Sequence, residues 1–91
     1  MMSVALIELA KKLTTSSISG KDFTATFFEQ WRSEGKSGIL AQDDDHLGDC
    51  LRLMFGLADS FTDGPKDRPT ELTESELKQE VSKLLSTYGY I

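Results

Sequence analysis

The segment that decides the fold is DDDHLGDCLRLMFGLADSF, residues 43–61. Carboxylates at Asp43, Asp44 and Asp45 suit the start of a helix, where unpaired backbone N–H groups and the helix dipole favour negative charge. We predict a helix that begins near Asp43 or Asp44 and ends near Phe61. Its apolar stripe recurs at helical spacing and consists of Leu47, Cys50, Leu51, Met54, Leu57, Ala58 and Phe61.

Two further helices are predicted before this segment. The first covers residues 2–14, and the second begins after an N-cap at Ser19 and runs to about Ser33, before the breaks at Gly35 and Gly38. We expect Phe23, Phe27 and Trp31 to be core residues, although Trp31 could instead be a partly exposed anchor. The two apolar faces are Leu6, Leu9, Ala10 and Leu13, then Phe23, Phe27 and Trp31 with Phe28 beside them.

A fourth helix is predicted near the C-terminus. Thr73 and Glu76 have the spacing of a capping box, and Gly89 marks the helix end. The apolar face of this helix consists of Leu77, Val81, Leu84, Leu85 and Tyr88. Residues 62–71 contain both prolines of the chain, so they are predicted to form a loop. No segment alternates with the period of a strand. The sequence therefore predicts an all-α protein, an antiparallel four-helix bundle formed by a single domain over residues 1–91.

The negative charge is concentrated in the middle of the chain. The net charge is −5, and residues 41–80 carry eleven acidic and four basic residues. A field of this sign repels phosphate, which argues against direct binding of nucleic acid. It attracts basic protein partners and speeds their encounter, although the same charge can also serve solubility alone.

A metal site is one interpretation of the acidic residues. Asp45, His46 and Asp49 have suitable ligand types at helical spacing. A calcium loop does not fit, because Leu47 and Met54 would occupy ligand positions. We therefore predict no metal and no other cofactor, and we expect His46 to be a solvent-exposed side chain without a role.

Catalysis is not predicted either. Cys50 lies on the apolar stripe, where a thiol behaves as a small hydrophobic group, and no glycine turn or orienting third group accompanies it and His46. Asp59-Ser60-Phe61 raises an acyl carrier as an alternative, because such proteins attach pantetheine to a serine in Asp-Ser-Leu that opens a helix. Here Ser60 follows an apolar stripe instead. An acidic helical carrier or adaptor that docks a basic partner stays open as the second interpretation.

The chain has no sequence mark of export or membrane insertion. Residues 1–10 lack the basic region of a signal peptide, and no run of about 20 apolar residues occurs. The single cysteine, Cys50, cannot form an internal disulfide, which suits a reducing compartment. We expect a cytoplasmic protein that does not bind membranes.

The order of these segments resembles the family of the colicin D immunity protein, which includes immunity proteins of contact-dependent inhibition systems. The resemblance is carried by ALIELAK (5–11), SSISGKDF (16–23), LMFGLADSF (53–61) and ELKQEVSKLL (76–85). Its most specific part is ADSFTD, residues 58–63. It implies a four-helix bundle that binds the nuclease domain of a tRNA-cleaving toxin.

In such a complex, carboxylates of the immunity protein would cover the basic cleft that otherwise takes the RNA phosphates. Hydrogen bonds between ionised partners are the strong ones, which suits this role. The resemblance implies a monomer that binds the cognate nuclease toxin domain one to one. The implied toxin-binding residues are Asp59 and Asp63 first, then Asp67 and Glu71 in the loop, with Asp49 and Asp45 beside Arg52 as an adjoining stripe.

Overall fold

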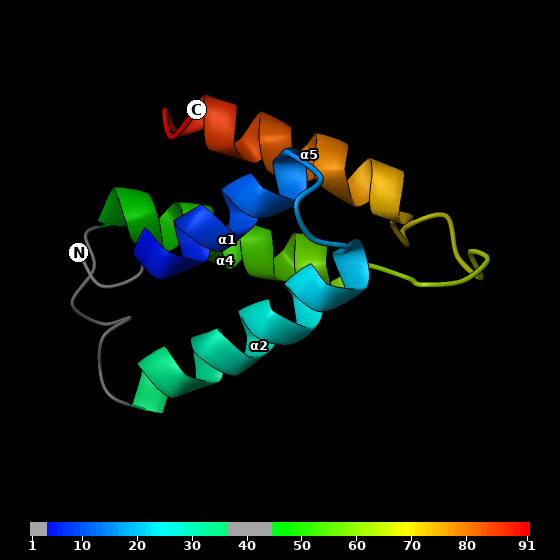
Figure 1. Cartoon of the computed structure of the whole chain (residues 1–91), viewed down its shortest axis with the longest axis horizontal. Helices are drawn as coiled ribbons and strands as arrows, with labels where there is room; N and C mark the ends of the chain where they lie inside the picture. The colour runs from blue at the N-terminus through cyan, green and yellow to red at the C-terminus, as the bar shows by residue number, and fades with distance from the viewer. Residues whose placement is uncertain (1–3, 37–44) are drawn as a thin grey trace.

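A computed structural model describes residues 4–36 and 45–91. The described residues form α1 (Val4–Thr14), α2 (Gly20–Lys36), α4 (Asp45–Asp59) and α5 (Glu74–Thr87). Successive helices run in opposite directions, and α2 is inclined across the other three (Figure 1). This part of the chain contains no strand, only an isolated bridge between Phe61 and Leu72. The all-α bundle predicted from the sequence is confirmed.

The core lies where the four predicted apolar faces meet. Burial of one large apolar side chain stabilises a fold by about 1.5–3 kcal/mol, so these faces provide the main driving force for packing. The largest fully buried side chains come from all four helices: Leu6 and Leu13, Phe23 and Phe27, Leu47, Leu51 and Met54, and Leu77, Val81 and Leu85.

Trp31 differs from the other predicted core aromatics. Phe23 and Phe27 are fully buried, whereas Trp31 is only partly buried. Its ring stacks on Phe27 at a centroid distance of 5.8 Å and lies 5.1 Å from that of Phe55. Trp31 therefore covers the edge of the core, because it stands one turn beyond the last buried ring of α2.

The predicted helix starts have the expected capping contacts. Ser19 Oγ accepts a hydrogen bond from the backbone N–H of Asp22 at 3.1 Å. Thr73 and Glu76 form a complete capping box, since each side chain accepts from the other residue's backbone N–H, at 3.3 and 3.0 Å. The predicted start at Asp43 or Asp44 lies outside the described residues.

Two helix ends differ from the prediction. α2 continues past Ser33 to Lys36, and α4 ends at Asp59 rather than at Phe61. The second difference has a clear cause: the carbonyl of Ser60 accepts from the backbone N–H of Leu72 at 2.8 Å, so the chain leaves the helix to pair with a distant segment. Gly89 does follow the end of α5, with a φ of +80° that glycine adopts without steric cost.

Two kinds of feature are absent from residues 4–36 and 45–91. No helix there is long and apolar enough to cross a membrane. No group of three or more His, Cys, Asp or Glu side chains there lies close enough together to hold a metal ion.

Candidate functional site

One exposed face of α4 carries three of the predicted site residues. Asp45, Asp49 and Asp59 are all exposed, and at about 100° per residue they fall within an arc of roughly 80° on the side away from the core. Arg52 lies within this arc and forms an ion pair with Asp49. We call Asp45, Asp49, Arg52 and Asp59 the α4 stripe. Asp45 and Asp59 stand at its two ends, about 21 Å apart along the helix axis.

Beyond Asp59 the chain enters a loop whose base is closed by backbone hydrogen bonds. Thr62 N–H donates to the carbonyl of Leu72 at 2.8 Å, beside the Leu72-to-Ser60 bond described above. Residues 60–62 thus form a short segment that is paired with Leu72. Asp59 comes directly before this segment, and Asp63 comes directly after it. Both are exposed, at the end of the bundle where the loop projects (Figure 1).

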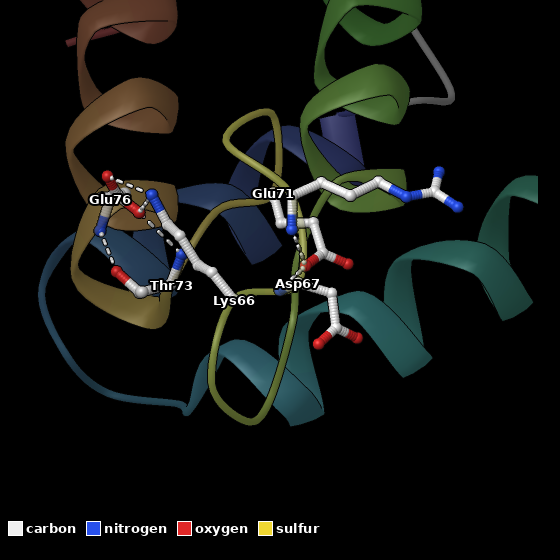
Figure 2. Close-up of polar contacts among 6 residues, drawn as sticks. Lys66, Asp67, Glu71, Thr73 and Glu76 are labelled. Atoms are coloured by element: carbon white, nitrogen blue, oxygen red, sulfur yellow. Dashed lines mark hydrogen bonds and ion pairs between the residues drawn. The ribbon is translucent and has the colours of Figure 1, made fainter.

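The loop is held in shape by two of its own polar groups. Glu71 Oε1 accepts from the backbone N–H groups of Asp67 and Arg68, at 2.7 and 3.2 Å. Lys66 reaches α5 and forms an ion pair with Glu76 at 2.7 Å, as Figure 2 shows. The Glu71 carboxylate, predicted to face a partner, thus also orders the loop backbone.

The residues on both sides of the loop also contact the start of α2. The backbone N–H of Gly20 donates to Glu74 at the start of α5. The ring of Phe61 lies so close that a Cβ on Gly20 would be 2.8 Å from Phe61 Cε1. Packing at this point fixes the end of α4, the loop and the start of α5 relative to one another.

Three carboxylates between the end of α4 and the start of α5 have no hydrogen bond or ion pair to any described residue. They are Asp59, Asp63 and Asp67, and all three are exposed. We call them the acidic corner. An incoming cation can bind them without first breaking an internal pair. At the far end of the α4 stripe, Asp45 is likewise unpaired within the described ranges.

Among the described residues, two groups have shifted pKa values, and both shifts have structural causes. The hydrogen bond from Lys66 lowers the pKa of Glu76 below its ordinary 4.5, helped by the backbone hydrogen bond from Thr73. Burial raises the pKa of the Cys50 thiol to about 11. At neutral pH that thiol is protonated, so it is a poor nucleophile.

Ser60 and His46, the candidate carrier serine and the candidate metal ligand, have defined places in the fold. Ser60 lies after the end of α4, and its hydroxyl donates to the carbonyl of Gly56 at 3.0 Å. This is the end of a helix, whereas the carrier alternative requires a serine that opens one. His46 is exposed, but its Nε2 lies 2.8 Å from the carbonyl oxygen of Tyr88, and its ring packs against Tyr88 and Tyr90.

The fold and its surface define a small helical protein that presents carboxylates from one end of a bundle. The chain matches the family described as bacterial self-protective colicin-like immunity over residues 2–88, and it belongs to that family. It is therefore a bacteriocin immunity protein, of a family of non-catalytic inhibitors. No curated protein matches the chain significantly.

Proposed function

We propose that this immunity protein binds the tRNA-cleaving domain of its cognate toxin, of the colicin D type, and covers the basic active-site cleft with the acidic corner. The observation that carries the proposal is the gathering of three unpaired, exposed carboxylates, Asp59, Asp63 and Asp67, at one end of the bundle. A cleft that binds RNA phosphates presents Lys and Arg side chains. Carboxylates bind the same donors through charge-assisted hydrogen bonds.

The way in which the loop is held supports this role. The side chains of Glu71 and Lys66 contact the loop backbone and α5, and these contacts fix the loop. Less conformational entropy is then lost when the acidic corner meets a partner, because the backbone is already ordered. The excess of negative charge also steers a basic toxin domain towards the immunity protein.

The α4 stripe extends the proposed surface. Asp49 would have to exchange Arg52 for a toxin cation, and an exposed ion pair contributes only about 0.2–1 kcal/mol, so this exchange is cheap. Asp45 is unpaired among the described residues and needs no exchange. We infer a one-to-one complex of monomers, formed in the cytoplasm where the toxin would meet tRNA.

The test is a tRNA cleavage assay with the nuclease domain encoded beside the immunity gene. Titration with the immunity protein should abolish cleavage at one equivalent. Cleavage that persists at a tenfold excess would contradict the proposal. If the protein binds a toxin domain that does not cut tRNA, the immunity function stands, but the proposal that the toxin is a tRNase is wrong.

A further inference from the structure

An apolar groove lies between α4 and α5, next to the α4 stripe. It has a volume of about 390 Å³ and is open to solvent. Leu53 and Leu57 form its α4 wall, while Leu84 and Tyr88 contribute the α5 wall. Leu53 is 54% exposed, although nearly all large apolar side chains of the described residues are at least partly buried.

The two walls share one sequence pattern. In each, a carboxylate residue precedes two apolar residues, and all three are spaced by one helical turn. Asp49, Leu53 and Leu57 are spaced by four residues along α4, so they lie in one row. Glu80 and Leu84 of α5 and its C-cap residue Tyr88 repeat this spacing. Figure 1 shows that α4 and α5 are antiparallel. Glu80, which lines the groove, and Asp49, one turn before the groove residue Leu53, therefore lie at opposite ends of the two rows.

Each of these carboxylates has a weakly held cation beside it. Arg52 pairs with Asp49, and Lys83 pairs with Glu80 at 3.3 Å. Both cations are well exposed, with side chains 65% and 73% accessible. Such pairs exchange readily, so both ends of the groove can accept a basic group from a partner.

We propose that this groove takes an apolar side chain of the toxin domain that is flanked by basic residues. This inference rests on the proposed function, because it names a second contact of the same complex. Carboxylates at both ends of the groove and along the α4 stripe match the basic surface of such a partner. Interfaces commonly join an apolar anchor in a pocket with a polar rim, and the acidic corner alone offers no apolar contact.

The test compares Leu53→Ser with Ile91→Ser, since the two side chains have nearly equal exposure, 54% and 56%. Binding to the catalytically inactivated toxin domain encoded beside the immunity gene is measured by calorimetry at several salt concentrations. Leu53→Ser should raise the dissociation constant about tenfold or more, as is usual for an interface anchor. Its salt dependence should match the wild type, because no charge changes, and Ile91→Ser should stay within about twofold. Thr87→Trp, which fills the groove from α5, should weaken binding to a similar extent.

Two results would overturn the inference without touching the proposed function. One is that the wild-type protein binds the toxin domain and that Leu53→Ser and Ile91→Ser bind it equally well. The other is a wild-type dimer in sedimentation that Leu53→Ser dissociates, because the occupant would then be a second copy of this chain. If the wild-type protein does not bind the toxin domain at all, the proposed function itself fails.

Discussion

The ring of Phe61 packs directly on the backbone of Gly20, where a Cβ would lie 2.8 Å from Phe61 Cε1 and 3.2 Å from Glu74 Cγ. Gly20 is the first residue of α2, Phe61 follows α4, and Glu74 begins α5. This one contact thus joins three helices beneath the acidic corner. A residue without a side chain is needed at position 20 for that approach.

Gly20→Ala should destabilise the protein by about 1–3 kcal/mol, as overpacking in a close contact does. Urea denaturation measures the change in the free energy of unfolding. Gly56→Ala is the matched control, because its added Cβ would meet no atom within 4 Å beyond its own neighbouring helix backbone, and alanine favours a helix by about 1 kcal/mol. Equal stability of the two variants would show that Phe61 moves aside freely.

Reversal of Asp59 and Asp63 to lysine should weaken toxin binding by about tenfold or more for each change and flatten its salt dependence. The reason is that both exposed carboxylates are proposed to pair with toxin cations. Calorimetry over a range of salt concentrations gives both quantities. Glu29→Lys, an exposed reversal on α2, controls for net charge. If all reversals weaken binding equally, the effect is general steering rather than contact.

Glu71→Gln and Glu71→Ala separate the two roles of this side chain. Glutamine retains a side-chain oxygen that can accept from the N–H groups of Asp67 and Arg68, whereas alanine does not. If Glu71 acts by ordering the loop, the glutamine variant should bind the toxin within about threefold of wild type and the alanine variant more weakly. Equal losses would instead indicate direct contact of the charge with the toxin.

The stability of the bundle should fall in acid partly through Glu76. Its pKa in the folded protein lies below the ordinary 4.5 because Lys66 donates to it. A lowered pKa stabilises the fold above the unfolded value, and this stabilisation is lost as pH falls from about 4.5 through the folded value. Glu76→Gln should reduce the pH dependence of unfolding in this window. In an NMR titration, Lys66→Met should raise the Glu76 pKa, and an unchanged value would contradict the assigned cause.

Cys50 should react with a thiol reagent only after the bundle opens. Its side chain is fully buried, and burial raises its pKa to about 11, so little thiolate forms at pH 8. The rate of modification should rise steeply with urea and follow the unfolded fraction. Rapid reaction of the folded protein would show that α4 does not pack as described.

The local features of the fold could be predicted from the sequence. Helical periodicity identified the buried faces of all four helices, and Thr73 and Glu76 marked the start of α5. These features depend on residues three or four positions apart, which meet on one helix whatever the rest of the chain does. The broader family, colicin-like immunity, was also predictable, because the match extends over residues 2–88, whereas the colicin D type stays a prediction.

The prediction was wrong where distant residues compete with local ones. α4 stops at Asp59 because Ser60 and Thr62 pair with Leu72. His46 is exposed as expected, but its contact with the carbonyl of Tyr88, 42 residues away, was not predicted. No residue spacing in the sequence predicts such contacts, because they form only when distant segments come together in the folded chain.

The acidic residues of 41–80 also show what the sequence determines and what only the tertiary structure decides. The sequence by itself determined how many carboxylates there are, and it favoured Asp59 and Asp63 as the proposed contacts. Only the tertiary structure decided which carboxylates are already used: Glu74 binds the backbone of Gly20, 54 residues away, and Glu76 holds Lys66. Asp59, Asp63 and Asp67 remain unpaired within the described residues. The physical reason is that charge is a property of each residue, whereas its availability depends on which donors the packed helices bring within reach.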